Sequence, residues 1–180
     1  MDKLLHDNNI LTGLLWEPES MSHLEPGAQA AFRGMVKANR RLVYKDANGQ
    51  LATGYCEKIS TLYEPFAIYI KDLFGDGIYF FHGDDNFTYL LIINNGRIVS
   101  GTDCFIERSL FDELMRHPEQ YEHLEITLLT EVQLSVVIEK CRAQQLSMKR
   151  RRRMIICSIL VGGIIFLVLL ALALHFLVTG

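Results

Sequence analysis

Residues 78–99 read IYFFHGDDNFTYLLIINNGRIV. Two runs rich in β-branched and aromatic residues, 78–81 and 87–93, flank the turn-forming tetrapeptide GDDN. A second turn, NNG at 94–96, leads into residues 97–99, and Asn-Gly is a strong hairpin signal because both residues tolerate positive φ. The stretch therefore predicts three consecutive antiparallel strands, a β-meander.

The chain before this meander alternates between short strands and helices. Apolar spacing and turn residues predict strands at 11–16, 41–45 and 51–56, a turn at 46–49, and helices beginning at Pro26 and spanning 62–74. The strands on either side of the 46–49 turn are expected to pair antiparallel. Gly75-Asp76-Gly77 is expected to end the second helix.

The chain after the meander has the same mixed character. It predicts a short helix at 109–116, a strand at 124–129, and a last helix that Thr130 caps and Glu131 begins. Apolar residues recur in that last helix at helical spacing: Leu134, Val137, Ile138 and Cys141. The expected fold class is α/β, a mixed sheet with an antiparallel meander and flanking helices. We assign residues 1–148 to this domain.

Residues 154–178 contain no Asp, Glu, Lys or Arg. At about 1.5 Å per residue a helix of this length reaches about 37 Å, and a bilayer's hydrocarbon core is about 30 Å thick. The segment therefore predicts one transmembrane helix at the C-terminal end of the chain.

Residues 149–153 form a basic collar directly before that segment. The five residues are Lys149, Arg150, Arg151, Arg152 and Arg153. Clustered Lys and Arg stay on the cytoplasmic side, so residues 1–148 are expected in the cytoplasm, with the span in a bacterial inner membrane. The collar can also attract anionic lipid headgroups, by about 1 kcal/mol per residue. Residues 1–9 are polar and do not predict a signal peptide, so the N-terminus is expected to stay where it is made.

Small residues in the predicted span offer a possible contact between helices. Ser158 and Gly162 have small-xxx-small spacing, and Gly163 lies beside them. Such spacing permits close approach of a second helix, in a homo-oligomer or with another membrane protein.

The charge of the chain is unevenly placed. Residues 1–148 hold all 21 Asp and Glu with 13 of the 18 Lys and Arg, a net of −8. An acidic domain argues against nucleic acid as a partner, because phosphate binding needs a basic face. The four cysteines, Cys56, Cys104, Cys141 and Cys157, have no metal-ligand spacing and predict reduced, buried or lipid-facing thiols.

Candidate catalytic groups are few. His82 with Asp84 and Asp85 could suggest a metal site, but adjacent acids on a turn point apart and a solvated turn is favoured. Asp103-Cys104 could suggest a nucleophile, but no His stands in an evident relation to it and a thiol at a strand end is favoured. The sequence has no GxxxxGK[ST] or GxGxxG phosphate-binding motif. We therefore predict a protein that is not an enzyme and has no cofactor or metal.

Several segments, in order, resemble a known family. They are GLLW at 13–16, RLVYKDANGQ at 41–50, ATGY at 52–55, YLLIINNGR at 89–97 and GTD at 101–103. This order resembles the pilin accessory proteins of the PilO type in type IVb pilus systems. These are similar in architecture to protein L of type II secretion, whose cytoplasmic region is actin-like. The resemblance covers roughly residues 10–178.

The resemblance implies an actin-like or ribonuclease-H-like unit that acts as an adaptor. Such proteins connect a cytoplasmic assembly ATPase to inner-membrane pilus or secretion proteins, and no catalytic residue carries over. The family usually continues into a periplasmic domain, whereas the sequence stops at Gly180. Two other functions remain open: a generic tail-anchored adaptor, and a membrane-tethered nucleotide-binding protein.

Overall fold

The computed structural model describes residues 2–18, 20, 25–45, 49–57, 63–83, 86–116 and 121–179, with only the helical backbone of residue 2 and residues 167–179. The chain divides into two compact units, Met1–Cys141 and Arg142–Gly180. Each unit is treated by itself.

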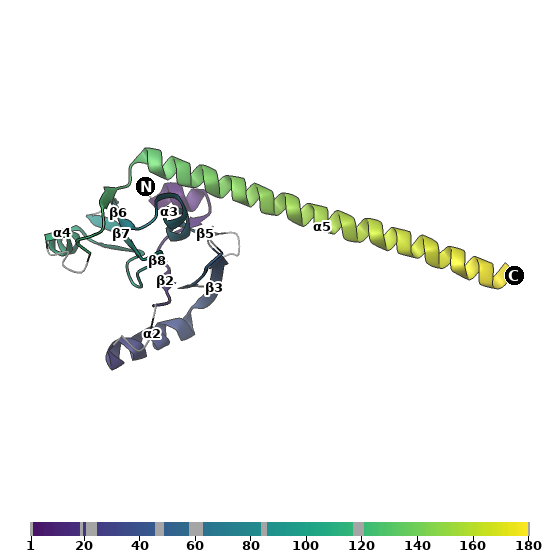
Figure 1. Cartoon of the computed structure of the whole chain (residues 1–180), viewed down its shortest axis with the longest axis horizontal. Helices are drawn as coiled ribbons and strands as arrows, with labels where there is room; N and C mark the ends of the chain where they lie inside the picture. Colours follow the sequence, from purple (N-terminus) through teal and green to yellow (C-terminus); the bar gives the residue numbers. More distant parts are fainter. Residues whose placement is uncertain are drawn as a thin grey trace. The chain divides into compact units, whose positions relative to one another are not determined.

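The first unit is built on a five-stranded mixed sheet (Figure 1). Its strands are β6 (Gly77–His82), β7 (Phe87–Asn94), β8 (Arg97–Ile98), β9 (Cys104–Glu107) and β10 (Ile126–Leu128). The order is β10-β6-β7-β8, and β9 also pairs with β7. β6, β8 and β9 are antiparallel to β7, whereas β10 is parallel to β6. The predicted meander is confirmed.

The turn between β7 and β8 shows why the meander is so clear in the sequence. Asn95 has φ 53° and Gly96 has φ 69°, so both central residues of this two-residue turn are left-handed. Asn and Gly are the residues that adopt this conformation most readily, and its twist matches that of the flanking strands. In the turn between β6 and β7, Asp84 and Asp85 lie outside the described residues.

Two smaller sheets complete the unit. A three-stranded antiparallel sheet has the order β2-β4-β3, and a two-stranded parallel sheet joins β1 to β5. Their strands are β1 (Ile10–Leu11), β2 (Leu15–Trp16), β3 (Arg40–Lys45), β4 (Leu51–Cys56) and β5 (Glu64–Pro65). The predicted pairing of β3 with β4 is confirmed, and residues 46–48 of their turn lie outside the described residues.

The predicted strand at 11–16 is wrong in one respect. It is two short strands that belong to different sheets. Gly13 separates them with a φ of +80°, a left-handed conformation that redirects the chain between β1 and β2.

The helices follow the apolar spacing of the sequence. They are α1 (Asp2–Asp7), α2 (Pro26–Ala38), α3 (Phe66–Phe74), α4 (Arg108–Arg116) and α5 (Glu131–Thr179). Pro26 opens α2 in the first turn, and Gly75, with φ +78°, caps α3. The predicted helices in these places are confirmed, except that the helix expected over 62–74 begins only at Phe66, because Glu64 and Pro65 form the strand β5. Helix α1 and the strands β5 and β9 were not predicted. Residues 58–62 and 117–120 lie outside the described residues.

The apolar core lies mainly between the large sheet and the helices α3 and α5. Large, fully buried side chains of this core include Leu5, Leu14, Trp16, Phe66, Ile70, Phe81, Tyr89, Leu91, Ile93 and Leu134. A second cluster on the sheet contains Ile78, Leu90, Ile92 and Phe111, and Phe111 brings α4 against it. Val137, Ile138 and Cys141 are buried as their helical spacing predicts.

Helix α5 begins as the sequence predicts. The amide nitrogen of Thr130 donates to the Gln133 side-chain oxygen at 2.7 Å, and the Thr130 hydroxyl also hydrogen-bonds to that oxygen. This contact is half of a capping box, which satisfies polar groups at the start of the helix. The helix is continuous from Glu131 to Thr179.

The second unit consists of the helical residues from Arg142 onward. The collar residues 149–153 are exposed, as are Ser158, Gly162 and Gly163. In the part of the chain whose side chains are described, no helix is both long enough and apolar enough to cross a membrane. The side chains of residues 167–178, about half of the predicted span, lie outside that part.

Candidate functional site

A break in the β7 ladder creates the most polar feature of the buried core. Ile93 pairs with Ile98, so in an unbroken antiparallel ladder Leu90 would face Gly101. Leu90 faces Cys104 instead, and the chain bulges between β8 and β9. Gly101 adopts φ +82° within the bulge. Such bulges re-aim a side chain, and here the redirected residue is Asp103.

Asp103 is 2% exposed and accepts four hydrogen bonds. The backbone amide of Gly13 donates to Oδ1 at 2.9 Å, and the amide of Leu14 donates to Oδ2 at 3.2 Å. The Trp16 indole nitrogen donates to Oδ2 at 2.9 Å, and the Tyr89 hydroxyl donates to Oδ1 at 2.6 Å. One carboxyl thus holds the chain that forms β2 against the large sheet.

Burial and hydrogen bonding act on this group in opposite directions. Burial raises the pKa of the Asp103 carboxyl, and the four donated hydrogen bonds oppose that rise. Burial and the nearby Asp103 raise the pKa of Tyr89 well above its ordinary value. Tyr89 therefore keeps its proton and donates it to the carboxyl. The group is enclosed by the core, so its role is to position β2.

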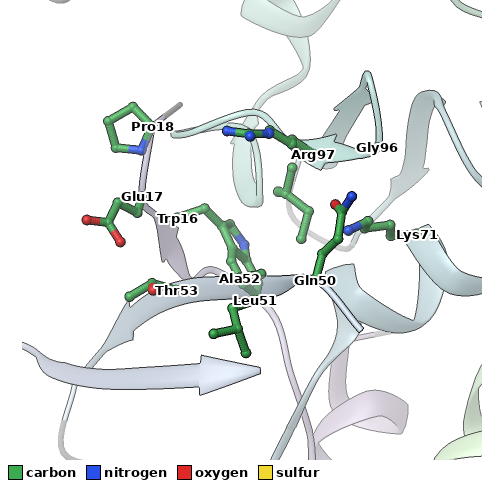
Figure 2. Close-up of a pocket in the computed structure, with 11 residues that line it drawn as sticks. Trp16, Glu17, Pro18, Gln50, Leu51, Ala52, Thr53, Lys71, Gly96 and Arg97 are labelled. Carbon is green, nitrogen blue, oxygen red and sulfur yellow. The ribbon is translucent and has the colours of Figure 1, made fainter. Parts of the chain in front are cut away.

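A second contact fixes the end of β2. The Ser100 hydroxyl donates to the Trp16 carbonyl oxygen at 2.6 Å. Beyond Trp16 the Glu17 amide still donates to the Thr53 carbonyl oxygen at 2.9 Å. Next to this contact, the described residues leave a space between β4 and β8. That space is a groove of about 610 Å³ (Figure 2), within the range of ligand pockets in proteins.

The groove is lined by residues from β2, β4, α3 and the turn into β8. They are Trp16, Glu17, Pro18, Gln50, Leu51, Ala52, Thr53, Lys71, Gly96, Arg97 and Ile98. Figure 2 shows Leu51, Ala52 and Thr53 in a row along β4, with Arg97 across the groove from them and Lys71 projecting from α3 beside Gln50. Two cations and one acid line the groove, whereas residues 1–148 as a whole are strongly acidic.

The described residues that line the groove form no arrangement typical of catalysis. Its charged residues are Lys71, Arg97 and Glu17, and its single hydroxyl is that of Thr53. Within the described ranges, no three His, Cys, Asp or Glu side chains lie close enough together to hold a metal ion. The arrangement can bind an anionic or extended ligand through its cations, its main-chain groups and its apolar wall.

The site residues predicted from sequence lie elsewhere. The collar residues 149–153 and the small residues Ser158, Gly162 and Gly163 belong to α5, and none of them lines the groove. An added Cβ at Gly162 or Gly163 meets no described atom within 4 Å. The thiol of Cys104 is half-buried at the start of β9, where it donates to the Gly101 carbonyl oxygen at 3.3 Å.

Sequence reasoning considered Asp103 only as a neighbour of a candidate nucleophile. Its role as the hydrogen-bonding centre of the fold was missed. One signal was present: Gly101-Thr102-Asp103 interrupts an otherwise apolar region between the meander and the next helix. The groove was also missed, because its walls come from four separate parts of the sequence.

The packing beneath the groove gives a testable prediction at Gly54. A Cβ there would lie 3.0 Å from Leu14 Cδ2 and 3.3 Å from a ring carbon of Trp16. We expect Gly54→Ala to lower the free energy of unfolding by about 1–3 kcal/mol because the core is overpacked. Thermal unfolding of the full chain in detergent, followed by the emission of its one tryptophan, measures the change.

The matched control for this prediction is Gly34→Ala in α2. A Cβ at Gly34 meets nothing within 4 Å, so the substitution removes only backbone freedom. We expect it to raise the stability by about 0.5–1 kcal/mol. Equal effects at Gly54 and Gly34 would contradict the close packing of β4 on β2.

Comparisons of the chain with protein-family models, with curated proteins and with solved structures find no match.

Proposed function

We propose that the protein is a membrane-anchored adaptor, not an enzyme, in a type IVb pilus or a related secretion machine. Its α/β unit binds a cytoplasmic assembly ATPase, and its C-terminal helix inserts into the inner membrane beside other membrane components. The observation that carries the proposal is the basic collar at 149–153 followed by the uncharged segment 154–178.

The topology of the large sheet supports an actin-like or ribonuclease-H-like origin for the unit. β6, β7 and the β8–β9 segment form an antiparallel meander, α4 follows, and β10 then pairs parallel to β6. A ribonuclease-H-like sheet likewise has three antiparallel strands, then a helix and a strand parallel to the first. Fold alone does not establish function, so the adaptor role also needs a binding surface.

The groove supplies a surface suited to binding. Its two cations and its exposed apolar wall are suited to a partner, and none of the described groups that line it is a nucleophile paired with a base. The same cations, Lys71 and Arg97, favour the second candidate, a membrane-tethered protein that binds a nucleotide through its phosphates.

The proposal is tested by affinity purification of the tagged full chain from its native cells. The chain is cross-linked in the membrane, solubilised in detergent, and its partners are identified by mass spectrometry. We expect recovery of an assembly ATPase together with pilus or secretion membrane proteins. The control is a variant with Arg150 to Arg153 replaced by Glu, which removes the positive-inside signal and is expected to lose these partners.

Recovery of the chain without any ATPase or membrane-machine component would contradict the adaptor role. Heat release on titrating the full chain with MgATP, together with loss of that heat in Arg97→Glu, would favour the nucleotide-binding alternative.

A further inference from the structure

We propose that the α/β unit docks on an anionic lipid surface through a basic face formed by α2 and β3. This surface, the α2–β3 face, consists of Arg33, Met35, Lys37, Arg41, Val43 and Lys45. The inference rests on the proposed function for the presence of a bilayer, which segment 154–178 is expected to enter. It adds a second contact with lipid, separate from the collar at 149–153.

Positive charge is concentrated in the stretch 26–45. This stretch holds five of the 13 Lys and Arg of residues 1–148 and no Asp or Glu. The rest of residues 1–148 has eight Lys and Arg against 21 Asp and Glu. The four cations of the α2–β3 face are exposed, and none of them forms an ion pair within the described ranges. Their charge is therefore available to an anionic surface outside the chain.

The strand β3 has one side toward the core and one side toward solvent. Leu42 and Tyr44 pack against the core. The alternate residues Arg41, Val43 and Lys45 are exposed, as expected for a strand covered on one side only. Val43 is 52% exposed. The outer side of β3 thus presents an aliphatic side chain between two cations.

Helix α2 packs on this same outer side of the small sheet. Arg41 of β3 pairs with Tyr55 of β4, so their side chains point to the same face of the sheet. The ring of Phe32 in α2 meets the ring of Tyr55 edge-on, with 6.0 Å between the ring centroids. The chain passes from α2 into β3 through Asn39 (Figure 1). The exposed residues of α2 and β3 therefore lie on one side of the three-stranded sheet.

The outer part of α2 is open to solvent. Phe32 is the buried residue of this helix, and a Cβ added at Gly34 meets nothing within 4 Å. Arg33 and Lys37 are four residues apart, so they project from the same flank of α2. Met35 is 48% exposed. Surfaces that bind lipid interfaces combine cations for the headgroups with apolar side chains that enter the acyl boundary.

The aliphatic side chains favour lipid over nucleic acid as the anionic surface. Faces that bind single-stranded nucleic acid add exposed aromatic rings to their cations. In this stretch Phe32 is buried and Tyr44 packs against the core, whereas Met35 and Val43 are exposed. A bilayer would also be close at hand, because insertion of segment 154–178 tethers the unit to it. Contacts that are weak alone become effective when a tether raises the local concentration.

The test measures amide hydrogen exchange of the full chain in nanodiscs that hold one copy each. Discs of phosphatidylcholine alone are compared with discs containing about one-third phosphatidylglycerol, an anionic lipid. We expect exchange across α2 to slow at least about threefold in the anionic discs, because binding stabilises the folded helix. Exchange across α4 should be the same in both discs. High salt should remove the difference at α2, because it screens exposed charges.

Two matched double variants locate the contact. Arg33→Glu with Lys37→Glu reverses the charge on α2 and should abolish the slowing. Arg108→Glu with Arg116→Glu makes the same change in net charge at exposed positions of α4 and should keep it. Both variants retain the collar. In neutral discs the α2 variant should exchange like the unaltered chain, which establishes that its helix is folded.

Equal exchange of α2 in neutral and anionic discs would overturn the inference, and so would equal slowing in the two double variants. Slowing that appears only in discs holding two copies would also overturn it, because the face would then bind the acidic surface of a second copy. If the chain enters discs and α2 shows no slowing, the docking face is wrong and the membrane anchor stands. If the slowing follows the expected variant pattern and no ATPase is recovered from cells, the lipid contact stands and the pilus assignment fails.

Discussion

The Asp103→Ala variant is expected to have a free energy of unfolding about 3–5 kcal/mol lower than that of the unaltered chain. The substitution removes one acceptor group and leaves four donors without a partner, three of them from Gly13, Leu14 and Trp16. Each buried donor left unsatisfied costs about 1–3 kcal/mol, and water entering the cavity recovers part of that loss. The fourth donor, the Tyr89 hydroxyl, stands in the centre of the core.

The measurement uses the single tryptophan of the chain as its reporter. Trp16 is 2% exposed and its indole nitrogen donates to Asp103, so urea unfolding of the full chain in detergent shifts its emission to longer wavelength. We expect Asp103→Ala to lower the urea concentration at the midpoint of unfolding. We also expect it to shift the tryptophan emission of the folded protein, because the indole nitrogen loses its hydrogen-bond acceptor.

Two further variants make the result specific to the carboxyl group. Asp103→Asn keeps one oxygen acceptor but turns an amide donor toward other donors, so its stability should fall between that of Asp103→Ala and that of the unaltered chain. Asp112→Ala removes an exposed acid of α4 and should change the stability by less than about 0.5 kcal/mol. If Asp103→Ala and Asp112→Ala unfold at the same midpoint, the hydrogen-bonding role assigned to Asp103 is wrong.

The contrast between the meander and Asp103 shows what the sequence can predict. The meander was predictable because its signals are local: the apolar runs of β6 and β7 and the left-handed pair Asn95-Gly96. The bulge that buries Asp103 depends on the register of β9 against β7. No local sequence pattern encodes that register. Its main partners lie about ninety residues earlier in the chain. A lone acid in a polar tripeptide looks the same in sequence whether it is solvated or buried.

The groove was beyond sequence reasoning for a related reason. Its two walls, β4 and β8, are separated in the chain by α3, β6 and β7. The strand β2 is only two residues long, and the groove lies beyond its end, where Glu17 and Pro18 line it. Glu17-Pro18 correctly predicted the end of the strand. The space that this end leaves open depends on the arrangement of other strands.

Charges placed in the predicted membrane span are expected to release the chain from the membrane. The double variant Ile165→Lys with Phe166→Asp places two opposite charges near the middle of segment 154–178 and keeps the net charge of the chain. A charged residue at the centre of a membrane helix costs about 2.5–3.5 kcal/mol, and adjacent residues of a helix do not face each other to form a pair. We expect the unaltered chain to stay in the membrane pellet after alkaline carbonate extraction, and most of the variant to be released.

The control for this prediction is Leu146→Lys with Ser147→Asp, which places the same two charges at exposed positions of α5 before the collar. Because these positions lie outside segment 154–178, the control should remain in the pellet like the unaltered chain. Release of all three proteins would contradict a transmembrane helix and leave the collar at 149–153 as an electrostatic contact with lipid headgroups. Retention of all three would show that the chain is held by something other than burial of this segment, such as a tightly bound membrane partner.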